Sequence, residues 1–297
     1  MDKKEIKSFL ENNQGYLKWG KKKLARKFRA SIEDVREALF EIKDSQPRNF
    51  KRLFFDIETS YNQGKFWRTG YKEVIRYEQI LIPSKIICVS WKWEGEDKVY
   101  NINWDRHQND LGLLRIMSDL MLEADEVIAH NGDRFDLKWL RTRCLKNRIP
   151  FPTYVRSLDT LKKVKSMFNF ENNKLNTIAQ ELGYGEKIKT DMSLWDKIIL
   201  EKDKQAMVRM LEYCDHDVVL LEDVYSTIMP YVKPNTHVAI HNGGDKCDCP
   251  SCGSNNVSYI KPMVTGKGNI QRHMMCDNCT SDYVISNADF KIFIKRD

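Results

Sequence analysis

Two carboxylates stand at the end of a short apolar run. Asp56 and Glu58 follow Leu53, Phe54 and Phe55, a pattern typical of a buried strand that ends in charged residues. Because successive side chains of a strand point to opposite faces, Asp56 and Glu58 emerge on the same side. Two carboxylates held this close repel each other unless a cation lies between them. The pair therefore indicates a Mg²⁺ or Mn²⁺ site, with two solvated charges at a strand end as the alternative.

A second group of polar residues lies at a predicted junction between a strand and a helix. Asn131 ends the strand, Gly132 permits a tight turn, and Asp133 is the expected N-cap of the helix. Asp136 then falls in the first helical turn, where its carboxylate either contributes to a site or only complements the helix dipole.

A phenol and a carboxylate lie one turn apart on a helix predicted over residues 205–228. Tyr213 and Asp217 share a face because they are four residues apart, and apolar residues beside them provide packing. Asp215 lies on another face and is expected to be solvated. The sequence thus predicts that Tyr213 and Asp217 point toward the protein interior.

Five of the eight cysteines lie in the last fifth of the chain. Cys249 and Cys252 form one C-x-x-C pair, Cys276 and Cys279 form another, and 23 residues separate the pairs. Paired knuckles at this separation predict a Cys₄ zinc ribbon that holds one structural Zn²⁺. Cys247 is an alternative ligand, so the sequence leaves the ligand set open at one position.

Composition bounds the kind of protein that carries these groups. The 297 residues are 41% hydrophobic and 31% charged, which is ordinary for a soluble protein and argues against a membrane or disordered chain. Two or three domains are expected at this length. The first residues lack the apolar stretch of a secretory signal, so the expected location is the cytoplasm, where clustered cysteines indicate metal instead of disulfides.

The net charge of +7 is concentrated at the start of the chain. Residues 1–52 carry 15 Lys and Arg against 8 Asp and Glu, whereas the rest of the chain is neutral. Helical spacing over residues 3–12, 17–28 and 31–43, with Ser31 as a cap, predicts a helix-turn-helix-like module that binds nucleic acid. A helical bundle that docks on the next domain is the alternative.

The central part of the chain alternates strands and helices. Strands are expected at residues 86–93, 99–104 and 126–130, and helices at 111–122 and 134–147, before a mostly helical stretch to about residue 231. This order predicts an α/β domain with a mixed sheet and helical cover.

In this order, the three polar strings resemble the DEDDy class of 3′–5′ exonucleases, whose fold is ribonuclease H-like. That family shows Asp-x-Glu at a strand end, Asn followed by an aromatic residue and Asp at a strand–helix junction, and Tyr-x-x-x-Asp on a late helix. The sibling class has His five residues before the last Asp, where this chain has Glu212. The resemblance implies that the catalytic residues are Asp56, Glu58, Asp136, Tyr213 and Asp217, and that the four carboxylates among them hold two Mg²⁺ or Mn²⁺ ions. The expected substrate contacts are Thr59, Asn131, Phe135 and Trp67, the last from an aromatic and basic loop at residues 64–72. Packing of the loop's aromatic side chains on the sheet is the alternative.

The predicted protein is therefore a metal-dependent 3′–5′ exonuclease that releases nucleoside 5′-monophosphates, with DNA favoured over RNA and no membrane partner. Three domains are expected: a basic helix-turn-helix-like module over residues 1–47, a ribonuclease H-like domain over 50–235 and a zinc ribbon over 236–297. The ribbon is expected to bind nucleic acid or dock a protein. The arrangement resembles small phage- or prophage-encoded exonucleases, which act in the host cytoplasm. The rival interpretation is a non-catalytic nucleic-acid-binding adaptor that uses its terminal modules.

Overall fold

The computed structural model describes residues 1–13, 15–16, 19–45, 49–67, 70, 74–185, 188 and 190–296, with only the backbone for residues 40–45. Within these ranges, none of the helices combines the length and the apolar run that a bilayer span requires. The predicted linker and the boundary near Pro47 fall partly on residues 46–48, which lie outside the described residues.

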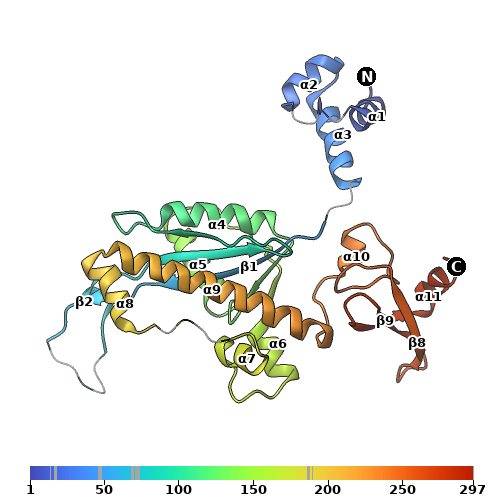
Figure 1. The fold of residues 1–297 in the computed structure, drawn as a ribbon. Coiled ribbons are helices and arrows are strands. Elements are labelled where there is room, and N and C mark those ends of the chain that lie inside the picture. Colours follow the sequence, from blue (N-terminus) through green and yellow to red (C-terminus); the bar gives the residue numbers. More distant parts are fainter. Residues whose placement is uncertain are drawn as a thin grey trace.

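Three helices form the N-terminal module: α1 (Lys3–Asn12), α2 (Lys21–Phe28) and α3 (Ile32–Ser45) (Figure 1). They share a small core of Ile6, Leu10, Leu24, Ala25, Phe28, Val35 and Ala38. The hydroxyl of Ser31 accepts the N–H of Asp34 at 2.9 Å, which confirms the predicted cap of the third helix. Arg29 adopts a left-handed conformation (φ 49°) in the turn between α2 and α3.

A five-stranded sheet of order β5-β4-β1-β6-β7 lies at the centre of the molecule (Figure 1). Its strands are β1 (Arg52–Thr59), β4 (Ile86–Trp93), β5 (Tyr100–Asn103), β6 (Glu126–Ala129) and β7 (Ser157–Asp159). β1 is antiparallel to β4 and parallel to β6, so the sheet is mixed, as predicted. The short β7 was not expected, because three residues are too few to show a two-residue period. A separate small hairpin pairs β2 (Gln63–Gly64) with β3 (Ile80–Ile82).

Helices cover both faces of this sheet, and β1 shows why. Its residues Leu53, Phe55 and Ile57 pack against α4 (Leu111–Glu123) and α5 (Asp136–Lys146). The alternate residue Phe54 packs on the other face against the long helix α9 (Lys204–Ile228). Strand alternation therefore aims Asp56 and Glu58, which share the face of Phe54, at α9.

The remaining helices lie between β7 and the C-terminal ribbon in the chain. They are α6 (Thr160–Met167), α7 (Leu175–Glu181), α8 (Met192–Asp196) and a π-helical turn at Lys197–Glu201, followed after α9 by Met229–Tyr231 and α10 (Val238–His241). α6 and α7 pack against the second half of α9 through Val164, Ile178 and Val224.

The C-terminal part is a second, smaller sheet of order β10-β9-β8. Its elements are β8 (Val257–Val264), β9 (Ile270–Cys276), β10 (Asp282–Ser286) and α11 (Asn287–Phe293). Its core contains Val257, Met274 and Ile285 together with three of the clustered cysteines. The fold is thus the expected ribbon of antiparallel strands below two cysteine knuckles.

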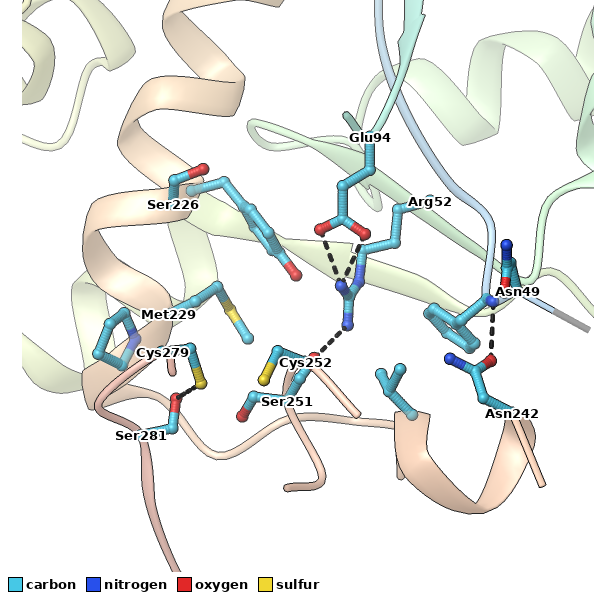
Figure 2. A pocket seen from close by; sticks show the side chains of 14 residues that line it. Asn49, Arg52, Glu94, Ser226, Met229, Asn242, Ser251, Cys252, Cys279 and Ser281 are labelled. Atoms are coloured by element: carbon cyan, nitrogen blue, oxygen red, sulfur yellow. Dashed lines mark hydrogen bonds and ion pairs between the residues drawn. The ribbon is translucent and has the colours of Figure 1, made fainter. Parts of the chain in front are cut away.

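Specific polar contacts join this ribbon to the central domain (Figure 2). The guanidinium of Arg52, the first residue of β1, donates to the carbonyl of Ser251 in the first knuckle at 3.1 Å. The N–H of Phe50 donates to the side chain of Asn242 at 2.9 Å. The preceding residue, His241, lies 3.1 Å from Asp125. A hollow of about 490 Å³ lies beside these contacts. The ribbon is therefore packed against the start of the strand whose other end carries Asp56 and Glu58.

Candidate active site and zinc-binding cluster

Three predicted carboxylates meet between β1 and α9. Asp56, Glu58 and Asp217 each offer an oxygen, and these oxygens lie within 4.8 Å of one another. Asp217 is buried, whereas Asp56 and Glu58 are half-buried, so the cluster lies at the edge of the core with access from one side. Hard oxygen donors in such a group fit a divalent cation such as Mg²⁺ or Mn²⁺.

Polar contacts between α9 and the sheet set the position of α9. The carboxylate of Asp215 accepts the hydroxyl of Ser90 at 2.6 Å and the amide of Asn101 at 2.7 Å. About two turns further along α9, Glu222 pairs with Lys92 of β4. The expectation that Asp215 is solvated is therefore wrong. Its charge is satisfied by two strands, and this anchor lies between Tyr213 and Asp217 on the helix.

Tyr213 is buried beside the cluster, as its spacing from Asp217 predicts. Its ring lies edge-on to Trp195 of α8, with centroids 6.4 Å apart. The indole N–H of Trp195 donates to the carbonyl of Thr59 at 3.1 Å. The neighbouring residue Asp196 accepts the hydroxyl of Tyr61 at 2.7 Å. α8 thus connects the end of β1 to the tyrosine, a role that no sequence motif of Trp195 indicated.

Asp136 approaches β1 from the other side and does not join the group of three. Its Oδ1 accepts the N–H of Ile57, between the two carboxylates of β1, at 3.3 Å. The side chain is 2% exposed, and this burial raises the pKa of Asp136 to about 7, with the negative charge of Asp159 adding to the effect. A fourth carboxylate is therefore held next to the cluster through the backbone of β1.

The turn before Asp136 differs in detail from the sequence prediction. The left-handed residue is Asn131 (φ 67°), whereas Gly132 is needed because a Cβ there would lie 2.4 Å from the Cβ of Ala129. The helix begins at Asp136 and not at residue 134, and Asp133 is not its N-cap, since it pairs with Lys162. The four residues after Asn131 form a turn that precedes the helix.

Asp159 holds this turn in place and was missed as a site residue. Its buried carboxylate accepts the N–H of Asn131 at 2.9 Å and caps α6 by accepting the N–H of Leu161 at 3.0 Å. One side chain therefore fixes both the turn that leads to Asp136 and the start of the next helix. The sequence signal was weak, because an Asp before a predicted helix is common.

The predicted substrate contacts occupy different positions around the cluster. Asn131 and Thr59 are half-buried near the strand ends, and Phe135 is 38% exposed directly before Asp136. Trp67 is fully exposed beyond the β2 strand and does not belong to the group of carboxylates. Residues 68–69 and 71–73 of the same loop lie outside the described residues.

The four predicted cysteines form a second candidate metal site. The sulfurs of Cys249, Cys252, Cys276 and Cys279 lie within 4.8 Å of one another, and the pairs Cys249–Cys279 and Cys252–Cys276 are both separated by 3.6 Å. Four thiolates bound tetrahedrally at 2.3 Å from Zn²⁺ would be about 3.8 Å apart, so the donor set fits this ion. The hydrogen bond with Cys249 lowers the pKa of Cys252, which favours the thiolate form of this ligand. Cys247 is buried outside this group.

The two knuckles repeat the same backbone geometry. Gly253 (φ 81°) donates its N–H to the carbonyl of Cys249 at 3.0 Å, and Thr280 (φ 61°) donates to that of Cys276 at 2.9 Å. Thr280 thus occupies the position where the first knuckle has glycine. A β-branched residue in the left-handed region is strained, so the second knuckle carries a backbone cost that the first avoids.

A sequence model described as the RNase_H superfamily matches residues 53–229, more than half of the chain and all of the candidate active site. This chain belongs to the ribonuclease H superfamily. The five-stranded mixed sheet with helices on both faces agrees with that membership.

Comparison with solved structures gives more distant similarities. The chain is similar to a family B DNA polymerase from the hyperthermophilic archaeon Pyrobaculum calidifontis, with 14% identity and a TM-score of 0.48 over 66% of this chain. It spans about a quarter of that polymerase, since 26% of the polymerase chain is covered. A second similar structure shows 3′-end specific recognition of histone mRNA stem-loop by a 3′-exonuclease, with 14% identity, a TM-score of 0.34, and 72% and 82% of the two chains covered. No curated protein matches the chain.

Proposed function

We propose that this chain is a metal-dependent 3′–5′ exonuclease of the DEDDy class that releases nucleoside 5′-monophosphates from nucleic acid, with DNA as the favoured substrate. The observation that carries the proposal is the group formed by Asp56, Glu58 and Asp217, whose oxygens lie within 4.8 Å of one another beside the buried Tyr213. A single strand end and a single helix supply all four side chains. A scaffold without chemistry has no need for three carboxylates that repel one another.

The residues divide into those that hold the ions and those that hold the water. Asp56, Glu58 and Asp217 would hold one Mg²⁺ or Mn²⁺, and Asp56, with Asp136 through a water, would hold a second. Such ions lower the pKa of a bound water and stabilise the leaving oxygen of a phosphodiester. The hydroxyl of Tyr213, with the carboxylate of Glu58, would orient the attacking water.

The terminal modules would bind nucleic acid away from the chemistry. All five basic side chains of α2 are exposed, and the helix has no acidic residue. The helix α3 carries five acidic and two basic residues. In a helix-turn-helix reader the second helix of the pair, here α3, would enter the major groove. We therefore assign phosphate binding to α2, since a helix with net negative charge is repelled by the backbone of DNA.

Isosteric variants of the cluster test the proposed activity. The wild type should shorten 5′-labelled single-stranded DNA from its 3′ end with Mg²⁺, and a 3′-terminal phosphorothioate should slow this reaction. Asp217→Asn and Asp56→Asn should each lower the rate by about 10³-fold, because the lost electrostatic stabilisation is worth several kcal/mol. Tyr213→Phe should cost less, because all the carboxylates remain.

Glu212→Gln is the matched control, since Glu212 is exposed on the same helix five residues before Asp217. It should cleave like the wild type. Nuclease activity that survives in Asp217→Asn would contradict the proposal. Release of the labelled 5′-terminal nucleotide before the strand is shortened from its 3′ end would also contradict it. A protein that binds the labelled strand but leaves it intact with Mg²⁺ and with Mn²⁺ would support the rival adaptor.

A further inference from the structure

A hollow beside the candidate active site has a composition suited to nucleic acid. Its volume is about 340 Å³, and it lies between α5 and the chain around the β2–β3 hairpin. The described residues that line it include four basic side chains and two large aromatic ones, and none of them is acidic. α5 begins at Asp136, so one end of this helix lies at the carboxylates and its side forms a wall of the hollow.

Three of the four basic side chains are available to a ligand. Arg143 is buried and neutralised, because its Nε and NH2 each lie 2.7 Å from the carboxylate of Asp110. Arg134, Lys138 and Lys146 are exposed, and within the described residues they form no ion pair. Lys138 and Lys146 are eight residues apart on α5, or about 12 Å along the helix axis. They form a row of positive charge that leads away from Asp136.

Aromatic side chains provide the second feature of the hollow. Tyr77 is 78% exposed at its rim, although a tyrosine gains stability from burial of its ring. Trp139 lines the opposite wall, and its ring lies 6.2 Å from that of Phe135, the residue directly before Asp136. Aromatic surfaces therefore extend from the carboxylates into the hollow.

We propose that this hollow binds the single strand immediately upstream of the cleaved 3′ end, with Lys138 and Lys146 on its phosphates and Tyr77 stacked on a base. Cations in a lining without acidic residues select a polyanion, and exposed aromatic rings beside them select one that carries bases. A duplex is too wide for a hollow of this volume, so the strand must be single. The assignment rests on the proposed exonuclease function, since it takes the strand end to lie at the carboxylates.

Binding without cleavage tests the proposal independently of the chemistry. Anisotropy of a labelled oligothymidylate of eight nucleotides is measured in chelator between 50 and 200 mM salt, with the full chain. Lys138→Ala/Lys146→Ala should reduce the slope of log affinity against log salt by about 1.4, since each phosphate contact on a single strand contributes about 0.7. Arg115→Ala/Arg141→Ala is the control, because it removes the same charge from exposed positions of α4 and α5 outside the hollow and should leave the slope unchanged.

A second pair of variants tests the aromatic contact. Tyr77→Ala should weaken binding at least about fivefold, which is the lower end of the contribution of one stacked base. Tyr154→Ala is the control, because Tyr154 is 96% exposed and does not line the hollow, and it should bind like the wild type. Both tyrosines are exposed, so neither change disturbs the core.

The outcomes separate this proposal from the proposed activity. With Mg²⁺, the KM of the lysine variant for the oligonucleotide should rise, whereas the Arg115→Ala/Arg141→Ala control should keep the wild-type KM. If the wild type binds but never cleaves, a reduced slope in the lysine variant still supports strand binding in the hollow, and only the exonuclease assignment fails. An unchanged slope and affinity in both the lysine and Tyr77 variants would overturn the proposal that the hollow binds the strand.

Discussion

Replacement of Arg52 by methionine should destabilise the protein and loosen the zinc ribbon. The guanidinium of Arg52 lies 3.0 Å from Glu126. It also lies 2.8 Å from Glu94 and donates to the carbonyl of Ser251 at 3.1 Å (Figure 2). The side chain of Arg52 thus contacts the adjacent strand β6, the turn after β4 and the first cysteine knuckle. Methionine retains the apolar stem and loses every one of these contacts.

The expected loss follows from burial. The side chains of Arg52 and Glu126 are 5% and 2% exposed, so the variant leaves a buried carboxylate without its charge partner. Breaking such a pair costs about 3–5 kcal/mol of unfolding free energy. Burial already raises the pKa of Glu126, and loss of Arg52 should raise it further. A carboxyl whose pKa is raised in the folded state contributes stability at low pH, and this contribution is lost as the pH rises. The loss of unfolding free energy in Arg52→Met should therefore be larger at pH 8 than at pH 5.5.

Urea unfolding followed by tryptophan fluorescence at these two pH values measures the effect. Lys51→Met is the control: Lys51 is the neighbouring residue, and its pair with Glu123, at 2.5 Å, is about half-exposed, so the expected loss is within about 1 kcal/mol. Arg52→Met/Glu126→Gln should recover part of the stability and remove the pH dependence. Release of zinc to a chromogenic chelator should be faster in Arg52→Met. If Arg52→Met is no less stable than Lys51→Met at either pH, the buried pair does not connect the two parts as argued.

Three further predictions concern the terminal modules. Thr280→Gly should stabilise the ribbon by about 1 kcal/mol and slow zinc loss to chelator, because it removes strain at φ 61°. Gly253→Ala should do the reverse, because the residue has φ 81° and its Cβ would lie 3.2 Å from Val238. Equal zinc loss in the two variants would contradict this prediction. Lys22→Ala/Arg26→Ala in α2 should lower the salt slope for duplex DNA by about 1.8 without changing hydrolysis of a small ester, and an unchanged slope would mean that α2 does not contact phosphates. Metal analysis of protein purified without chelator should find about one zinc per chain, and protein without zinc but with a folded ribbon would refute the Cys₄ assignment.

Much of the candidate site follows from local rules. The two-residue period of β1 puts Asp56 and Glu58 on one face, and the four-residue spacing on α9 puts Tyr213 beside Asp217. The spacing of the C-x-x-C pairs likewise indicated the four-cysteine group. These predictions succeed because each depends on backbone geometry within one element, which the sequence of that element determines.

Other local predictions were wrong because a distant residue changed the outcome. Asp133 was expected to cap the helix that carries Asp136, but Asp159, 26 residues later, binds the backbone of this turn and the helix starts at Asp136 itself. Asp215 was expected in solvent, yet Ser90 and Asn101 bind its carboxylate from two strands. A polar residue on a helix looks solvated in sequence unless its partner on another element is known.

The sequence by itself determined which side chains can hold metal and which face of each element presents them. Only the tertiary structure decided that three carboxylates lie within 4.8 Å of one another while Asp136 reaches the backbone of Ile57 instead. It alone also revealed the contact of Arg52 with the first cysteine knuckle, 199 residues away in the chain. The physical reason is range: dihedral preferences and side-chain periodicity act over a few residues, whereas hydrogen bonds and ion pairs act through space, between residues whose approach depends on the packing of the whole chain.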